Sequence, residues 1–189
     1  VYGGGFRGSV GTSTFTGITT TVTVTGGIID GSVYGGGQGG PDPVSSGNSN
    51  TTGRAYVFGG VEVNITGGVI GQNVYGGGQG AQMTSNDINY NGGNYDEGGV
   101  RDTAKVTGNV IIHIGGDALV EGSVYGGGMG LSESVAENNN DVSGIASISG
   151  SVSVYITSGT VKLSVFGGGE YGYVGTGDDL LTIDISDSE

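Results

Sequence analysis

The sequence predicts an all-β fold, a right-handed parallel β-helix in which about 26 residues and three short strands form each coil. Glycine accounts for 46 of the 189 residues. The motif Val-Tyr-Gly-Gly-Gly recurs along the chain, and Val or Ile stands at alternate positions before most copies of it. Such alternation indicates half-buried strands, and no i, i+3, i+4 helical pattern competes with it.

The recurring motif divides the chain into repeats of one kind. Four copies read Val-Tyr-Gly-Gly-Gly and a fifth reads Val-Phe-Gly-Gly-Gly; they begin at Val1, Val33, Val74, Val124 and Val165. Alignment backwards from each motif gives a common core. In a single domain of residues 1–189 we expect cores at about 13–39, 55–80, 104–130 and 146–172, with a C-terminal strand at 180–186.

Each core contains three candidate strands, taken here in chain order. Ala-x-Val comes first, Val-x-Val-x-Ile second, and a third strand ends in Val-Tyr, with glycines at the bends where a positive φ is expected. A unit of this size cannot bury its apolar face alone and must stack on copies of itself. An antiparallel glycine-rich sandwich also fits this strand spacing, but it gives no reason for the same strand to recur in the same slot.

Stacked parallel coils place equivalent residues about 4.8 Å apart, so like side chains lie on like. One predicted interior column contains Val33, Val74, Val124 and Val165. A second contains Val24, Ile65, Ile114 and Ile156. The residues after the first column should point outward as an aromatic ladder of Tyr34, Tyr75, Tyr125 and Phe166. Stacked rings leave no free face for a sugar, so we expect the ladder to be structural, each pair contributing roughly 0.5–1.5 kcal/mol.

The motif Val-Tyr-Gly-Gly-Gly-x-x-Gly, preceded by Val-x-Ile-Thr-Gly-Gly, resembles the glycine-rich repeat regions of large secreted adhesin-like bacterial surface proteins. The resemblance spans nearly the whole chain. It implies a β-solenoid stalk displayed at the cell surface or outside the cell. It brings no catalytic residue with it.

Three polar insertions, at 40–54, 81–103 and 131–145, are predicted to leave the coil at one corner. In repeat proteins such a corner is often the contact face, although tolerated surface loops have the same appearance. The longest insertion holds the candidate contact residues Tyr90, Tyr95, Asp96 and Glu97, a composition suited to glycans or to a host protein.

Charge and composition exclude several classes of function. The formal charge of −13 repels phosphate backbones, so we expect no nucleic-acid partner, and no apolar run is long enough for membrane insertion as a helix. The absence of Cys and the single His leave too few ligands for a zinc site. No cofactor is expected.

Asp178 and Asp179 follow Gly-x-Gly in one copy of a pattern typical of calcium-binding β-rolls. Those sites are formed by repetition across adjacent turns, and no second copy follows. A plain acidic turn is the preferred interpretation, and no metal site is predicted.

Parallel β-helices also include polysaccharide-cleaving enzymes, which need aligned carboxylates and a cationic partner for an acidic sugar. The exposed strand positions Glu62, Asn64, Ile111, His113, Ser153 and Tyr155 form no such row. We therefore expect a non-enzymatic protein. Short acceptor patterns mark Asn50 and Thr103, both in insertions, as possible glycosylation sites.

The expected function is that of an extracellular structural or adhesive protein, a stalk or fibre subunit. The chain starts inside a motif and ends with an alternating strand, Leu181 to Ile185, and neither end has a polar cap. We expect either head-to-tail self-association into a filament or flanking repeats in a longer chain. The alternative is a carbohydrate-binding or polysaccharide-degrading β-helix with its site in the insertion loops.

Overall fold

The computed structural model describes residues 1–39, 55–80, 104–130, 146–175 and 180–186. Within these residues the protein is all β and contains no helix. The strands are β1 (Ile18–Ile29), β2 (Val33–Tyr34), β3 (Gly59–Ile70), β4 (Val74–Tyr75), β5 (Val110–Ile114), β6 (Leu119–Val120), β7 (Val124–Tyr125), β8 (Val152–Ile156), β9 (Thr160–Val161), β10 (Val165–Phe166) and β11 (Leu181–Ile185).

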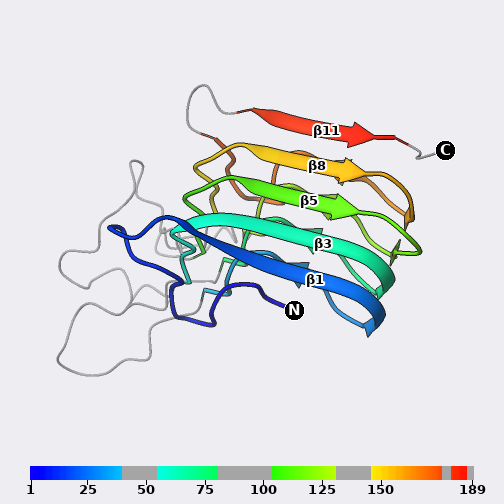
Figure 1. Ribbon diagram of the computed structural model, residues 1–189, viewed down its shortest axis with the longest axis horizontal. Coiled ribbons are helices and arrows are strands. Elements are labelled where there is room, and N and C mark those ends of the chain that lie inside the picture. Colours follow the sequence, from blue (N-terminus) through cyan, green and yellow to red (C-terminus); the bar gives the residue numbers. More distant parts are fainter. Residues whose placement is uncertain (40–54, 81–103, 131–145, 176–179, 187–189) are drawn as a thin grey trace, which may run out of the picture.

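The strands form two parallel sheets. The larger sheet has seven strands in the order β11-β8-β5-β3-β6-β9, with β1 also paired to β3. Figure 1 shows its long strands β1, β3, β5, β8 and β11 side by side in chain order, from blue to red. The smaller sheet has the order β10-β7-β4-β2. Because the strands of both sheets pair in parallel, the antiparallel sandwich is excluded.

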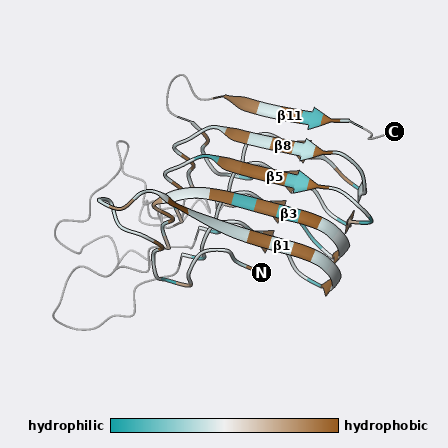
Figure 2. Cartoon of the chain, viewed as in Figure 1, coloured by the Kyte–Doolittle hydropathy of each residue, from teal (hydrophilic) through white to brown (hydrophobic). Residues whose placement is uncertain are grey.

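Each repeat core forms one layer, and equivalent residues of adjacent layers pair with one another. Ile65 pairs with Val24 of the layer before and with Ile114 of the layer after, and Ile114 pairs with Ile156. The predicted second apolar column is confirmed, and Ile185 of β11 extends it by one layer. Figure 2 shows the resulting alternation of apolar and polar residues along the long strands.

The smaller sheet stacks the predicted valine column in register: Val33, Val74, Val124 and Val165. The first three valines are fully buried, whereas Val165, in a later layer, is only partly buried. The interior is therefore filled with β-branched side chains that face one another across the two sheets, as the alternation predicted.

The larger sheet curls because β1 and β3 turn a corner while they remain paired. The first part of β3 pairs with β5 and its last two residues pair with β6. Gly27 and Gly68 lie at this corner with φ of 85° and 87°, which L side chains rarely adopt. In later layers Gly116 and Gly159 make the same bend, and there the chain divides into β5 and β6 or β8 and β9.

The division into three strands per layer is wrong in detail. The Ala-x-Val segments form single-residue bridges instead of strands; Val57, for example, bridges Val10 and Val106. Gly108 bends the chain two residues after Val106, which leaves room for one bridge only. The glycine corner adds a two-residue strand, such as β6 or β9, that the sequence pattern did not separate.

The glycine triplets serve close packing rather than positive φ. A Cβ at Gly77 would lie 2.7 Å from Cα of Gly128, and one at Gly37 would lie 2.7 Å from Cβ of Ala55. At Gly76 an added Cβ would meet the backbone oxygen of Gly126. The described glycines with positive φ lie outside the triplets. The expectation of a positive φ thus holds at the corner and is wrong for the triplets, which leave no room for a side chain except at Gly167 and Gly168 of the last layer.

Candidate functional site

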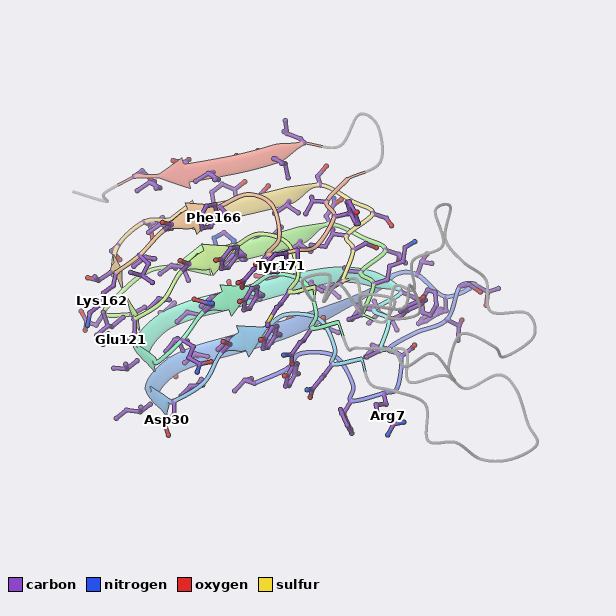
Figure 3. The ribbon with its side chains drawn as sticks, turned by 180° about the vertical axis from the view of Figure 1, so that it is seen from behind. Arg7, Asp30, Glu121, Lys162, Phe166 and Tyr171 are labelled. Carbon is purple, nitrogen blue, oxygen red and sulfur yellow. The ribbon has the colours of Figure 1, made fainter. Side chains whose placement is uncertain are left out.

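The aromatic ladder is a continuous stack of five rings. Ring centroids are 4.8 Å apart between Tyr2 and Tyr34 and between Tyr34 and Tyr75. They are 5.0 Å apart between Tyr75 and Tyr125 and 4.9 Å apart between Tyr125 and Phe166, with interplanar angles of 4° to 15° along the stack. Figure 3 labels Phe166 at one end of this aromatic stack. The four predicted rings do lie on one another, and Tyr2 is a fifth member that the ladder prediction missed.

The expectation that the ladder points outward is wrong for Tyr34 and Tyr75, called here the central rings, while Tyr125 is only partly buried. Tyr34 is 5% exposed and Tyr75 is 1% exposed, whereas Phe166 at the end is 45% exposed. Each central ring lies between the rings of two adjacent layers, and its hydroxyl contacts side chains that follow the glycine triplets. Stacking and these contacts together remove the tyrosines from water.

Each of three hydroxyls in the stack donates a hydrogen bond to a residue two layers further along. Tyr34 donates to Sδ of Met129 at 3.1 Å, Tyr2 donates to Oε1 of Gln79, and Tyr75 donates to Oε2 of Glu170. We call Gln79, Met129 and Glu170 the acceptor column, because they follow their glycine triplets at the same offset and bridge one another in parallel. That constant offset is the sequence signal that could have identified them.

The Tyr75 hydroxyl has a second partner, since Asn73 donates to it from Nδ2 at 2.9 Å. Oδ1 of Asn73 also accepts a hydrogen bond of 2.8 Å from the backbone N–H of Ser123 in the next layer. Tyr75 is therefore held by three consecutive layers. Its position is set by hydrogen bonds as well as by ring packing.

Burial changes the acidity of the stacked phenols. It raises the pKa of Tyr34 to about 12, with a smaller contribution from the neighbouring Tyr2. Burial and the hydrogen bond to Glu170 raise the pKa of Tyr75 still further, and burial also raises the pKa of Tyr2. Desolvation disfavours the charged phenolate, so these rings are neutral over the whole physiological range.

The outer face of the long strands contains the exposed positions where a polysaccharide-cleaving enzyme would need aligned carboxylates. Glu62 accepts a hydrogen bond from Nδ2 of Asn64 at 2.8 Å, and His113 stacks on Tyr155 with ring centroids 5.0 Å apart. Ile111 separates Glu62 from Ser153 in the register of the sheet. In the part of the chain that the structure describes, no three His, Cys, Asp or Glu residues are grouped as metal ligands.

One ion pair joins equivalent positions of adjacent layers at the corner after the short strands. Nζ of Lys162 contacts Oε2 of Glu121, and both side chains remain substantially exposed. Figure 3 shows this pair at one edge of the molecule with Asp30 on the same edge, far from Arg7 and Tyr171. An exposed pair of this kind contributes little to stability, about 0–1 kcal/mol.

The insertions all begin and end at equivalent places. They come directly after Gly39, Gly80 and Gly130. In the first and last layers, which carry no insertion, only three residues connect the corresponding bridged positions, Phe6 to Val10 and Glu170 to Val174. The residues proposed within them, and the acidic turn, lie outside the described residues: Tyr90, Tyr95, Asp96, Glu97, Asn50, Thr103, Asp178 and Asp179.

Comparisons with protein-family models, with curated proteins and with solved structures find no match to this chain. The described residues contain no helix of the length and apolarity needed to cross a membrane.

Proposed function

We propose that this chain is a segment of a right-handed parallel β-solenoid that serves as a non-enzymatic structural or adhesive element, a stalk or fibre subunit outside the cell or at its surface. One observation carries the proposal: equivalent residues of successive repeats pair in parallel register, layer on layer, through both sheets and the aromatic stack. A stack of this kind lengthens by one layer with each repeat.

The surface of β11 supports growth of the stack beyond the described layers. Leu181, Ile183 and Ile185 continue the interior columns, yet they are 52%, 45% and 66% exposed. One edge of β11 pairs with β8, and no described strand pairs with the other. An apolar row beside an unpaired strand edge is a template for a further strand. That strand belongs to a flanking repeat of a longer chain or to a second copy, as in a filament.

The non-enzymatic assignment rests on the outer face of the sheet. Residues in one register row there change type from layer to layer, as in Asn64, His113, Tyr155 and Asp184. A stalk needs only a soluble outer face, whereas a sugar-cleaving site needs carboxylates at a fixed separation. Location outside the cell follows the resemblance of the glycine-rich motif to secreted surface proteins.

One observation favours the second candidate, a carbohydrate-binding or polysaccharide-degrading β-helix. In each of three layers an insertion lies between the same two columns of bridged residues: Gln38, Gln79 and Met129 before it, and Val57, Val106 and Ile148 after it. Any ligand contacts that the insertions make would therefore lie along one corner of the stack. A variant that lacks residues 84–100 and keeps the circular dichroism spectrum of a β protein would test this candidate. Loss of glycan binding in that deletion would favour it over the stalk.

Self-association is tested by analytical ultracentrifugation of the full chain over a range of concentrations. Ile183→Lys places a charge on the apolar row of β11, and Thr182→Lys places the same charge on the other face of that strand. A second-copy contact predicts association of the wild type and of Thr182→Lys, and loss of association in Ile183→Lys. A wild type that stays monomeric at every concentration excludes the filament and leaves flanking repeats as the occupant.

A further inference from the structure

The hydroxyls of the aromatic stack differ in the chemistry of the atom that accepts their hydrogen bond. Tyr2 donates to an amide oxygen of Gln79 and Tyr34 donates to the thioether sulfur of Met129. Tyr75 donates to a carboxylate oxygen of Glu170. An amide oxygen and a thioether sulfur are extremely weak bases, whereas a carboxylate is a base strong enough to take a proton from an oxidised phenol.

We propose that Tyr75 and Glu170 form a proton-coupled oxidation site, in which the aromatic stack passes an electron vacancy to Tyr75. A dissolved metal-complex oxidant, such as trivalent ruthenium tris-bipyridine, takes one electron from the stack and is itself reduced to the divalent complex. The O–H bond of Tyr75 then breaks, its proton moves to Oε2 of Glu170, and a neutral tyrosyl radical remains beside a protonated carboxyl group. One electron leaves with the oxidant and one proton stays on Glu170, so the pair changes from a net charge of −1 to zero.

The contact geometry suits this step. An oxidised phenol is a far stronger acid than a neutral one, and it releases its proton fastest to a base already in hydrogen-bond contact. Glu170 is in that contact, and the bond from Asn73 keeps the phenol oxygen in place. In the resting state burial and the same hydrogen bond raise the pKa of Tyr75, so the phenol keeps its proton until an electron is removed.

The stack supplies a route to this buried ring. Tyr75 is 1% exposed and cannot be reached directly by a dissolved oxidant, but Tyr2 is only partly buried. From Tyr2 through Tyr34 to Tyr75, each ring centroid lies 4.8 Å from the next. These faces are in van der Waals contact, which allows an electron vacancy to move between them. Burial then shields the radical from coupling with other radicals.

The test is flash photo-oxidation of the full chain with ruthenium tris-bipyridine and persulfate, followed by electron paramagnetic resonance. Glu170→Gln keeps the shape of the side chain and an acceptor oxygen but removes the base. We expect a long-lived tyrosyl signal in the wild type and a loss of about tenfold or more in both Glu170→Gln and Tyr75→Phe. Tyr155→Phe, whose ring stacks on His113 outside the aromatic stack, is the matched control and should leave the signal unchanged.

Circular dichroism of each variant establishes that the fold is kept. A radical yield and lifetime in Glu170→Gln equal to those of the wild type would overturn the proposal, as would a persistent signal in Tyr75→Phe. Tyr34→Phe tests the route, because the radical at Tyr75 should then form more slowly and persist as long. Equal rates of formation in Tyr34→Phe and the wild type would overturn transfer from Tyr2 through Tyr34 and leave the partly buried Tyr125, which stacks on the other face of Tyr75, as the route.

Discussion

Strands β8 and β11 have the same alternating pattern and pair residue by residue, yet they differ in burial. Val152 and Val154 of β8 are 0% exposed, while their partners Leu181 and Ile183 of β11 are 52% and 45% exposed. The difference arises because each layer is covered by the layer that follows it. Burial in this protein is a property of the stack and not of the single repeat.

A buried charge should give the largest difference in stability between the covered layers and β11. Val63 of β3 is 0% exposed, and Val63→Asp should cost several kcal/mol and unfold at least its own layer, because an unpaired carboxylate is then buried. Ile183→Asp should cost less than about 1 kcal/mol, since water reaches that position. Urea unfolding followed by circular dichroism measures both, and equal costs would contradict the layer model.

A single methyl group in the glycine triplets should have the next largest effect. Gly77→Ala places a Cβ against the backbone of Gly128, where neither chain segment can move freely, and should cost about 3 kcal/mol. Gly168 occupies the equivalent position in a later layer, and nothing lies within 4 Å of an added Cβ there. Gly168→Ala should be neutral to within about 0.5 kcal/mol in the same denaturant titration.

Alkaline pH should act on the interior of the aromatic stack. The pKa of folded Tyr34 is about 12 against a reference of 10.0, so the neutral phenol is favoured by folding. The corresponding stability is fully present below pH 10.0 and is lost as the pH rises towards about 12. Unfolding midpoints should fall over that interval, and phenolate absorbance should appear at Tyr34 only late in it. A midpoint that stays constant there would show that Tyr34 is accessible to water.

Removal of one hydroxyl tests the links between layers. Tyr75→Phe leaves Asn73 and Glu170 without their shared partner while the ring contacts remain, and should cost about 1–2 kcal/mol. Tyr155→Phe, on the outer face, should change the free energy of unfolding by less than about 0.5 kcal/mol. Thermal unfolding of the two variants side by side decides whether the hydroxyl contacts add to the stacking.

The smallest expected effect is a gain in stability at a turn near the end of the stack. Tyr171 has a φ of 56° and is 64% exposed, and Arg7, at the equivalent place in the first layer, has a φ of 55°. Tyr171→Gly removes the steric cost of positive φ, partly offset by the greater freedom of glycine in the unfolded chain. We expect a net gain of about 0.5–1 kcal/mol in the free energy of unfolding. Destabilisation instead would show that the Tyr171 side chain contributes to packing.

The sequence alone was sufficient for the features that depend on repetition. Parallel pairing, the register of the Val and Ile columns and the identity of four stacked rings follow from the recurrence of one motif, because equivalent residues of stacked repeats must meet. The sequence did not show which segments of each repeat pair as strands. Glycine marks both a corner such as Gly68 and a tight contact such as Gly77, and composition does not distinguish positive φ from lack of space.

The burial of the stack, and which residue of the acceptor column each hydroxyl contacts, were decided by the tertiary structure. Tyr75 and Glu170 are 95 residues apart in the chain, and their contact joins layers that are not adjacent. A motif repeated in sequence indicates which residues lie over one another in adjacent layers. It does not show which side chains meet across two layers, because such contacts depend on the packing of all the layers together.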